Sequence, residues 1–263
     1  MSGKVKVERD GEVEVISIDR PEAFNAFDHG LISDFSEALV ATAKDKEVRG
    51  VVITGVGKAF CAGGDLKAIL DFKGGAGAGF HALASFFHRA VLEIRRMGKP
   101  VIAAVNGIAA GGGFSLALAC DFRVMERSAT LRQAYSSSGL CIDGGGSFTL
   151  PRLVGLARAM EIIAFDRPIS ADDALEWGLA TKVVEDGEAL TGAVAMAKEL
   201  SSISLHSFAL MKRLITDSFD TPFETQIERE RLALATCGEH PDGIEGMKAF
   251  VEKKRPVFNK SNK

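Results

Sequence analysis

Two glycine-rich stretches end apolar segments at points where helices are expected to begin. The first is residues 59–66 (AFCAGGDL) and the second is residues 105–113 (VNGIAAGGG). A glycine N–H is not shielded by a side chain. At a helix N-terminus it also lacks an intrahelical acceptor and lies at the positive end of the helix dipole. Two such donors could bind a carbonyl oxygen as it becomes an enolate, so the pattern predicts an oxyanion hole.

The composition is that of an ordinary globular protein, with 46% hydrophobic and 25% charged residues among 263. A formal net charge of −3 provides no general attraction to nucleic acid or to an anionic membrane. No signal-peptide pattern opens the sequence and no apolar run is long enough to span a membrane, so we expect a cytoplasmic location. The four cysteines are scattered among apolar or small residues, and we expect them to be reduced and structural: Cys61, Cys120, Cys141 and Cys237.

The first half of the chain alternates between expected strands and helices. Residues 13–19 (VEVISID) alternate apolar and polar side chains, which is typical of a strand buried on one face. Residues 28–46 repeat apolar side chains at helical spacing, with Asp28 as the expected N-cap. Further strands are expected at residues 50–54, 100–105 and 122–125, and further helices at 81–97 and 112–120.

One glycine-rich segment interrupts the strands and helices expected in the first half of the chain. Glycines at positions 74, 75, 77 and 79 predict that residues 71–79 form a mobile loop covering a site. The second half of the chain is mostly helical, with helices expected at residues 157–165, 171–177, 190–201, 207–218 and 223–237. We expect a division into two regions near residue 200.

The order of several motifs resembles that of the crotonase superfamily, which contains the enoyl-CoA hydratases and isomerases. These motifs are Arg20-Pro21 with Asn25-Ala26, residues 60–66, residues 99–113, Leu150-Pro151-Arg152, residues 174–179 and residues 250–258. The resemblance implies an α/β fold in which residues 1–200 form a spiral of ββα units. This spiral is expected to carry the acyl-CoA site. The resemblance also implies a C-terminal helical region, residues 201–263, that assembles the chain into a homotrimer or a dimer of trimers.

The same resemblance implies acyl-CoA thioesters as substrates, with coenzyme A entering only as part of the substrate and with no permanently bound cofactor. It places the two oxyanion donors at the backbone N–H groups of Gly64 and Gly112. The histidines have no metal-ligand spacing with cysteines or carboxylates, so no metal is expected. Fold membership alone does not establish the reaction.

The catalytic carboxylates of the family's hydratases are absent from this sequence. The resemblance places the two hydratase glutamates at positions that hold Ser115 and Tyr135 here. A hydroxyl cannot replace a carboxylate as a base near neutral pH, because tyrosine titrates near ~10 and serine higher still. Water addition through paired glutamates is therefore not expected.

One carboxylate, Asp143, lies in residues 139–146 (GLCIDGGG), where hydratases usually have glycine. The resemblance to the family's double-bond and ring isomerases implies that Asp143 moves protons between carbons. The alternative is that Asp143 only caps the helix that follows the glycines, because aspartate is a favoured N-cap.

His88 and Tyr135 leave the chemistry of the site open. In the family's dehalogenases an aspartate at the position of Asp143 attacks an aromatic ring, and a histidine at the position of His88 assists it. His88 could also be a packing residue on an amphipathic helix. Tyr135 could form a hydrogen bond with Asp143 or the substrate, or its ring could simply line the pocket.

The resemblance also implies where coenzyme A binds. Backbone groups of Ala23, Phe24 and Ala62 would contact adenine, and Gly64, Asp65 and Leu66 would lie beside the pantetheine. Lys67 and Lys254 are candidates for the phosphates.

The sequence thus favours an acyl-CoA isomerase that works through an enolate. Three alternatives stay open: an enoyl-CoA hydratase, a dehalogenase or thioesterase with Asp143 as nucleophile, and a non-catalytic acyl-CoA-binding subunit.

Overall fold

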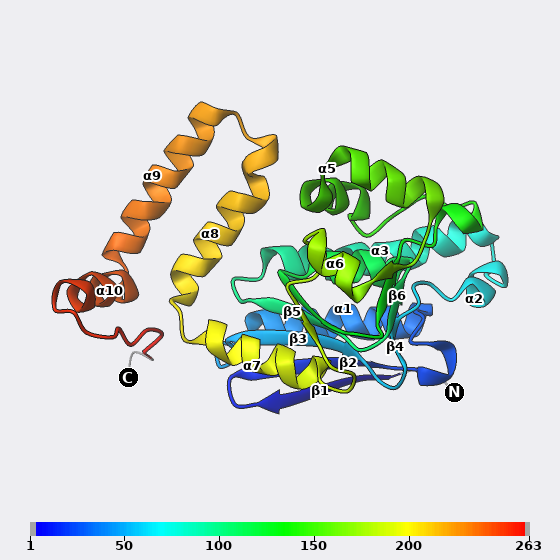
Figure 1. Cartoon of the computed structure of the whole chain (residues 1–263), viewed down its shortest axis with the longest axis horizontal. Helices are drawn as coiled ribbons and strands as arrows, with labels where there is room; N and C mark the ends of the chain where they lie inside the picture. Colours follow the sequence, from blue (N-terminus) through cyan, green and yellow to red (C-terminus); the bar gives the residue numbers. More distant parts are fainter. Residues whose placement is uncertain (1–3, 261–263) are drawn as a thin grey trace.

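A computed structural model describes residues 4–260 of the chain. Within that range the strands form a six-stranded sheet and a four-stranded sheet (Figure 1). In sheet order the first contains β1 (Lys4–Asp10), β2 (Val13–Asp19), β3 (Gly50–Gly55), β5 (Val101–Val105), β7 (Phe122–Glu126) and β10 (Lys182–Val184). The second contains β4 (Ala59–Cys61), β6 (Ile108–Ala110), β8 (Thr130–Arg132) and β9 (Ile169–Ser170). Parallel pairing of β2, β3, β5, β7 and β10 and of β4, β6 and β8 gives the expected α/β spiral.

The helices cover both sheets and extend beyond them. In chain order the α-helices are α1 (His29–Lys44), α2 (Leu66–Leu70), α3 (Ala76–Arg96), α4 (Gly112–Ala119), α5 (Gly146–Phe165), α6 (Ala171–Glu176), α7 (Ala189–Ser201), α8 (Leu205–Asp217), α9 (Phe223–Glu239) and α10 (Pro241–Val251). The short 3-10 helices are η1 (Pro21–Ala23), η2 (Ser136–Ser138) and η3 (Ser218–Asp220). In the part of the chain that the structure describes, no helix is long and apolar enough to cross a membrane.

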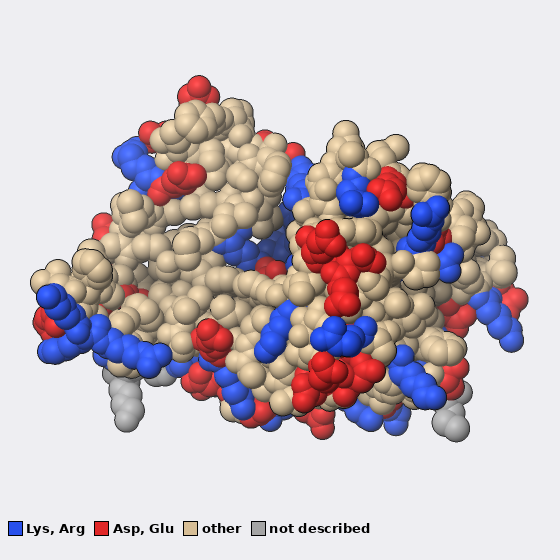
Figure 2. All heavy atoms as spheres, viewed as in Figure 1, with Lys and Arg blue, Asp and Glu red and all other residues tan. Residues whose placement is uncertain are grey.

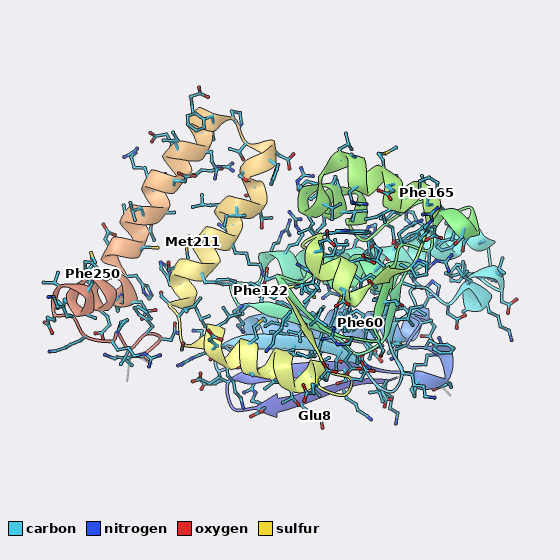
Figure 3. All side chains as sticks on the ribbon, viewed as in Figure 1. Glu8, Phe60, Phe122, Phe165, Met211 and Phe250 are labelled. Atoms are coloured by element: carbon cyan, nitrogen blue, oxygen red, sulfur yellow. The ribbon has the colours of Figure 1, made fainter. Side chains whose placement is uncertain are left out.

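Two apolar layers hold the six-stranded sheet. On one face Ala189, Ala193 and Ala197 of α7 pack against strand residues such as Val52 and Ile102. The larger layer, on the other face, joins the two sheets to α1, α3 and α4, and Figure 3 shows Phe60 within it. Fully buried strands explain why β3 and β5 are continuous apolar runs.

Residues 71–79 differ from the predicted mobile loop, because α3 begins at Ala76. A Cβ on Gly79 would lie only 3.0 Å from the Cβ of Phe72, so this glycine allows close packing. The His29 ring stacks on Phe72 at 4.8 Å between centroids, and its Nε2 lies 3.2 Å from the Gly79 carbonyl oxygen. Residues 76–79 are therefore helical, and Gly79 allows close packing against Phe72.

Beyond α7 the chain forms a C-terminal arm, residues 205–260, that extends away from the two sheets (Figure 1). Figure 3 shows Met211 and Phe250 on this arm. Neither α8 nor α9 contains a buried residue. Residues of α8, α9 and the end of α3 line a cavity of about 800 Å³, and Figure 2 shows Lys and Arg side chains in this hollow. The arm was predicted as a separate helical region, although its last helix, α10, was not.

Lys212 of α8 ties the arm to the core. Its ammonium donates to the Asp121 carboxylate at 2.7 Å and to the Ile94 carbonyl oxygen at 2.8 Å, and the Lys212 side chain is only 8% exposed. Burial raises the pKa of Asp121. The Asp121 carboxylate also accepts the Val101 N–H at 2.9 Å. One interior carboxylate thus links α8 to β5.

Replacing Lys212 with methionine is expected to lower the free energy of unfolding by about 3 kcal/mol, because it leaves the Asp121 charge without its partner. Urea denaturation measures the change. Lys198→Met is the matched control, since its partner Asp10 is about half exposed and exposed pairs contribute roughly 0–1 kcal/mol. Equal losses in the two variants would contradict the importance of the Lys212 contact.

Candidate active site

The first glycine loop is held by the turn at residues 20–27. The buried Asn25 side chain donates to the carbonyl oxygens of Val56 at 3.0 Å and Ala59 at 2.7 Å. Phe24 accepts the Ala62 N–H at 3.0 Å, and the Phe27 N–H donates to the Gly63 carbonyl at 2.7 Å. These contacts fix the backbone of the loop from both sides.

Asp65 closes this loop as the N-cap of α2. Its Oδ1 accepts the N–H groups of Lys67 and Ala68, both at 3.1 Å, and its Oδ2 lies 2.8 Å from the Arg20 guanidinium. Burial acts to raise the pKa of Asp65, but the Ala68 N–H and Arg20 outweigh it and lower the pKa. The Gly64 N–H, one residue earlier, has no hydrogen-bond partner within residues 4–260.

The second glycine loop meets the first at the start of α4. Gly111 has a φ of 54° and its N–H donates to the Arg132 carbonyl at 3.1 Å. Gly112 is the first residue of α4, and its N–H has no partner in the described part of the chain. A Cβ on Gly63 would lie 2.8 Å from the Gly112 nitrogen. The two loops therefore bring two unpaired backbone donors, from Gly64 and Gly112, to one place.

Asp143 does not cap a helix. Gly145 is the N-cap of α5, and no side chain supplies a capping hydrogen bond there. The Asp143 carboxylate, one-third exposed, contacts Tyr135 and His88 instead. A Cβ on Gly144 would lie 2.3 Å from the Phe87 ring, so glycine is required for the backbone beside Asp143 to approach α3. The capping alternative is therefore wrong.

Tyr135 donates its phenol hydrogen to Asp143. Its oxygen lies 2.6 Å from Oδ1 of Asp143 and 3.3 Å from Oγ of Ser115, and the residue is only 8% exposed. Burial, and then the Asp143 charge, raise the pKa of Tyr135, so the phenol stays protonated. With Oδ1 occupied by this hydrogen bond, Oδ2 is the oxygen available to another group.

His88 of α3 lies on the other side of Asp143. Its Nε2 is 3.6 Å from Oδ2, beyond hydrogen-bond distance. The Gly144 N–H donates to the same Nε2 at 3.3 Å. We assign the ring proton to Nδ1 from that contact, because a nitrogen that accepts a hydrogen bond does not carry the proton. In this arrangement His88 touches Asp143 without donating to it.

Asp166, the residue directly after α5, binds the loop that carries Tyr135. Oδ1 of Asp166 accepts the Ala134 N–H at 2.7 Å, and its carboxylate pairs with Arg132 at 3.4 Å. Burial would raise the pKa of Asp166, but hydrogen bonds from Ser137 and Ala134 lower it overall. No motif in the sequence pointed to Asp166.

Gly64, Gly112 and Asp143 line one pocket of about 370 Å³. Most of its other walls are apolar, which strengthens electrostatic interactions inside. The lining residues are Phe27, Gly64, Phe80, His81, Leu83, Ala84, Phe87, Gly112, Tyr135, Leu140, Cys141 and Asp143.

The whole chain is similar to proteins of one known family. The model of the enoyl-CoA hydratase/isomerase family matches residues 8–261. The chain belongs to the enoyl-CoA hydratase/isomerase family. It is 35% identical to the 1,2-epoxyphenylacetyl-CoA isomerase of Escherichia coli over 94% of each chain. It is 32% identical to 4-chlorobenzoyl coenzyme A dehalogenase-1 of Arthrobacter sp, over 95% of this chain and 91% of that one.

A solved structure extends the similarity to the whole fold. An enoyl-CoA hydratase from Polaromonas sp. JS666 superposes with a TM-score of 0.92 at 37% identity, covering 97% of this chain and 99% of that one. Among these relatives of the enoyl-CoA hydratase/isomerase family, the names cover isomerisation, dehalogenation and hydration. Family membership therefore confirms an acyl-CoA enzyme and leaves its reaction open.

Most of the residues expected to contact coenzyme A in this family member lie together. Ala23 and Phe24 are on the turn that holds the first glycine loop, and that loop supplies Ala62, Gly64, Asp65, Leu66 and Lys67. Lys254 is three residues beyond the end of α10, and Figure 1 shows α10 on the arm, away from the two sheets. The Lys254 ammonium pairs with Glu252 at 2.8 Å.

The structure also identifies two polar pocket residues that the sequence analysis did not assign to the site. Cys141 was expected to be structural, but it is exposed and lines the pocket, whereas Cys61 and Cys120 are buried as predicted. His81 of α3 lines the same pocket. Two signals could have indicated them: Cys141 lies two residues before Asp143 in residues 139–146, and the helical spacing of His81 and His88 indicates a shared face. Residues 4–260 contain no group of three or more potential ligands that could hold a metal ion.

Proposed function

We propose that this family member isomerises an enoyl-CoA, by a double-bond or ring shift, through a thioester enolate. The observation that carries the proposal is a pocket with two unpaired N–H donors and one lining carboxylate, Asp143. The two positions where the resemblance implies hydratase glutamates hold the hydroxyl groups of Ser115 and Tyr135 instead. One carboxylate is sufficient to carry a proton from one carbon to another.

In the proposed double-bond shift, the thioester carbonyl oxygen binds the Gly64 and Gly112 N–H groups. Oδ2 of Asp143 takes a proton from the α carbon, and the C–H electron pair becomes part of a dienolate whose charge rests on the carbonyl oxygen. The same carboxyl then returns the proton to the γ carbon. The double bond moves from the β,γ to the α,β position, and Asp143 is regenerated.

Tyr135 is proposed to orient Asp143 while remaining neutral. Tyr135→Phe removes the 2.6 Å hydrogen bond to Oδ1 without removing the ring. Hydrogen bonds to charged groups contribute about 1.5–3 kcal/mol, so we expect kcat for isomerisation to fall about tenfold or more. Steady-state kinetics measure the loss. Ser138→Ala is the control, because the Ser138 hydroxyl bonds only the Ala134 carbonyl in the same loop. An unchanged kcat in Tyr135→Phe would contradict the orienting role.

The contact between His88 and Asp143 favours one second candidate, in which an oxygen of Asp143 bonds to a ring carbon of a halogenated aryl-CoA and expels the halide ion. Water activated by His88 then attacks the carboxyl carbon of the resulting aspartyl ester, which releases the hydroxylated aryl-CoA and regenerates Asp143. The Nε2 atom, 3.6 Å from Oδ2, is the group that would accept a proton from that water. A single turnover in ¹⁸O-labelled water would then place the label in the Asp143 carboxylate. The isomerase proposal predicts that Asp143 stays unlabelled.

The product formed from 2-enoyl-CoA and 3-enoyl-CoA tests the proposed function. Isomerisation predicts interconversion of the two with no 3-hydroxyacyl-CoA. Rapid formation of 3-hydroxyacyl-CoA would instead support a hydratase. Tight acyl-CoA binding without turnover on any chain length would support a non-catalytic subunit.

Assembly into a homotrimer or a dimer of trimers is also proposed. The support is the C-terminal arm, because no residue of α8 or α9 is buried and apolar packing within the chain therefore contributes little to these helices. Apolar side chains such as Phe219 and Phe223 are about two-thirds exposed or more. A monomeric mass by light scattering at micromolar concentration would contradict this assembly.

A further inference from the structure

One part of the pocket is not used by the proposed chemistry. The Gly64 and Gly112 donors take the thioester oxygen, and Asp143 takes the reacting carbons. The rest of the lining, left for the remainder of the acyl group, includes Phe80, Ala84 and Leu140, with His81 and Cys141 as polar side chains. This remaining part of the lining is mainly apolar and contains one imidazole, that of His81.

His81 and His88 lie on one face of α3. They are seven positions apart, which returns the helix to nearly the same face after two turns and about 10 Å along its axis. His88 lies beside Asp143, and His81, two turns earlier on α3, lines the same pocket as Asp143. The imidazole is thus about one medium-length acyl group away from the reacting carbons.

The His81 ring is exposed and has no hydrogen-bond or ion-pair partner in the described range, residues 4–260. Its pocket neighbours on α3 are the apolar Phe80, Leu83 and Ala84. A purely hydrocarbon acyl group would cover the imidazole without pairing it, and an unpaired buried polar group has a cost. An oxygen on the acyl group would satisfy it.

We propose that His81 is a specificity residue that binds an oxygen function, a hydroxyl or a carboxylate, at the distal end of the acyl group. This inference rests on the proposed function for the orientation of the thioester. It names the substrate class as oxygenated, medium-length acyl-CoA thioesters. The acyl group would extend along α3 from Asp143 toward His81.

Binding of saturated acyl-CoA thioesters tests this inference separately from turnover. The probes are octanoyl-CoA, 8-hydroxyoctanoyl-CoA and the mono-CoA thioester of octanedioic acid, titrated calorimetrically into the full chain. We expect at least one oxygenated probe to bind tenfold or more tightly than octanoyl-CoA, and the pattern distinguishes hydroxyl from carboxylate recognition. Equal affinity for all three probes would overturn the inference, even if the isomerase activity is found.

Variants of His81 assign the preference to this side chain. In His81→Leu, the affinity for the oxygenated probe divided by the affinity for octanoyl-CoA is expected to fall to nearly one. His81→Gln keeps a hydrogen-bond donor and is expected to retain part of the ratio. A ratio that survives in His81→Leu would overturn the assignment. If oxygenated probes bind through His81 and no enoyl-CoA is isomerised, the proposed function fails while the binding site remains.

Discussion

Replacing Asp143 with asparagine is expected to lower kcat for the isomerisation of 3-enoyl-CoA by about 10²–10⁴-fold, the usual contribution of a general acid or base. Asparagine has nearly the same shape but cannot accept the proton. The amide can still occupy the space between Tyr135 and His88. Conversion to 2-enoyl-CoA, followed by absorbance or NMR, measures the loss.

The control for this variant is its substrate affinity and stability. Asp143 is one-third exposed and caps no helix, so Asp143→Asn should keep its melting temperature within a few degrees. The affinity for a saturated acyl-CoA should also change little. A variant with near-normal kcat would show that another group moves the proton.

Replacing Gly112 with proline is expected to lower kcat by about 10²–10³-fold, the loss that follows removal of one oxyanion donor. Gly112 is the first residue of α4, a position where proline is well tolerated because its N–H has no intrahelical acceptor. Gly111 before it can adopt the conformation that proline requires, since it has no side chain. The substitution therefore removes the N–H and keeps the helix.

Gly112→Ala is the matched control. A Cβ at this position would lie 3.5 Å from the Gly63 Cα and 3.6 Å from the Phe87 ring, which are ordinary contacts. Alanine keeps the N–H, so its kcat should stay close to that of the unchanged enzyme. Similar losses in the two variants would indicate that crowding, and not the donor, determines the rate.

Much of the spiral could be predicted from sequence because its strands are buried on both faces. Continuous apolar runs identified β3 and β5 almost to the residue, and Asp28 capped α1 as expected by accepting the Leu31 N–H at 2.8 Å. The two glycine loops were predicted because a bare N–H at a helix start is a local property of the chain.

Features that depend on contacts between distant segments were missed. The packing of Gly79 against Phe72 turned an expected loop into the start of α3. No local pattern could place Cys141 on the pocket wall, and a lone cysteine among apolar neighbours resembles a core residue. The hydrogen bond from Tyr135 to Asp143 was one of two alternatives in the sequence, and the structure selects it.

The most direct measurement of the central claim is NMR of 3-enoyl-CoA incubated with the protein in D₂O. If Asp143 moves protons between carbons through an enolate, 3-enoyl-CoA will be converted to 2-enoyl-CoA. The γ carbon of the product and the α carbon of the unreacted substrate will carry deuterium in those molecules for which the Asp143 carboxyl proton exchanges with solvent before it is returned. The conversion and the deuterium uptake will both fall about 100-fold or more in Asp143→Asn. A 3-hydroxyacyl product without deuterium at the γ carbon, formed equally well by the variant, would contradict the account.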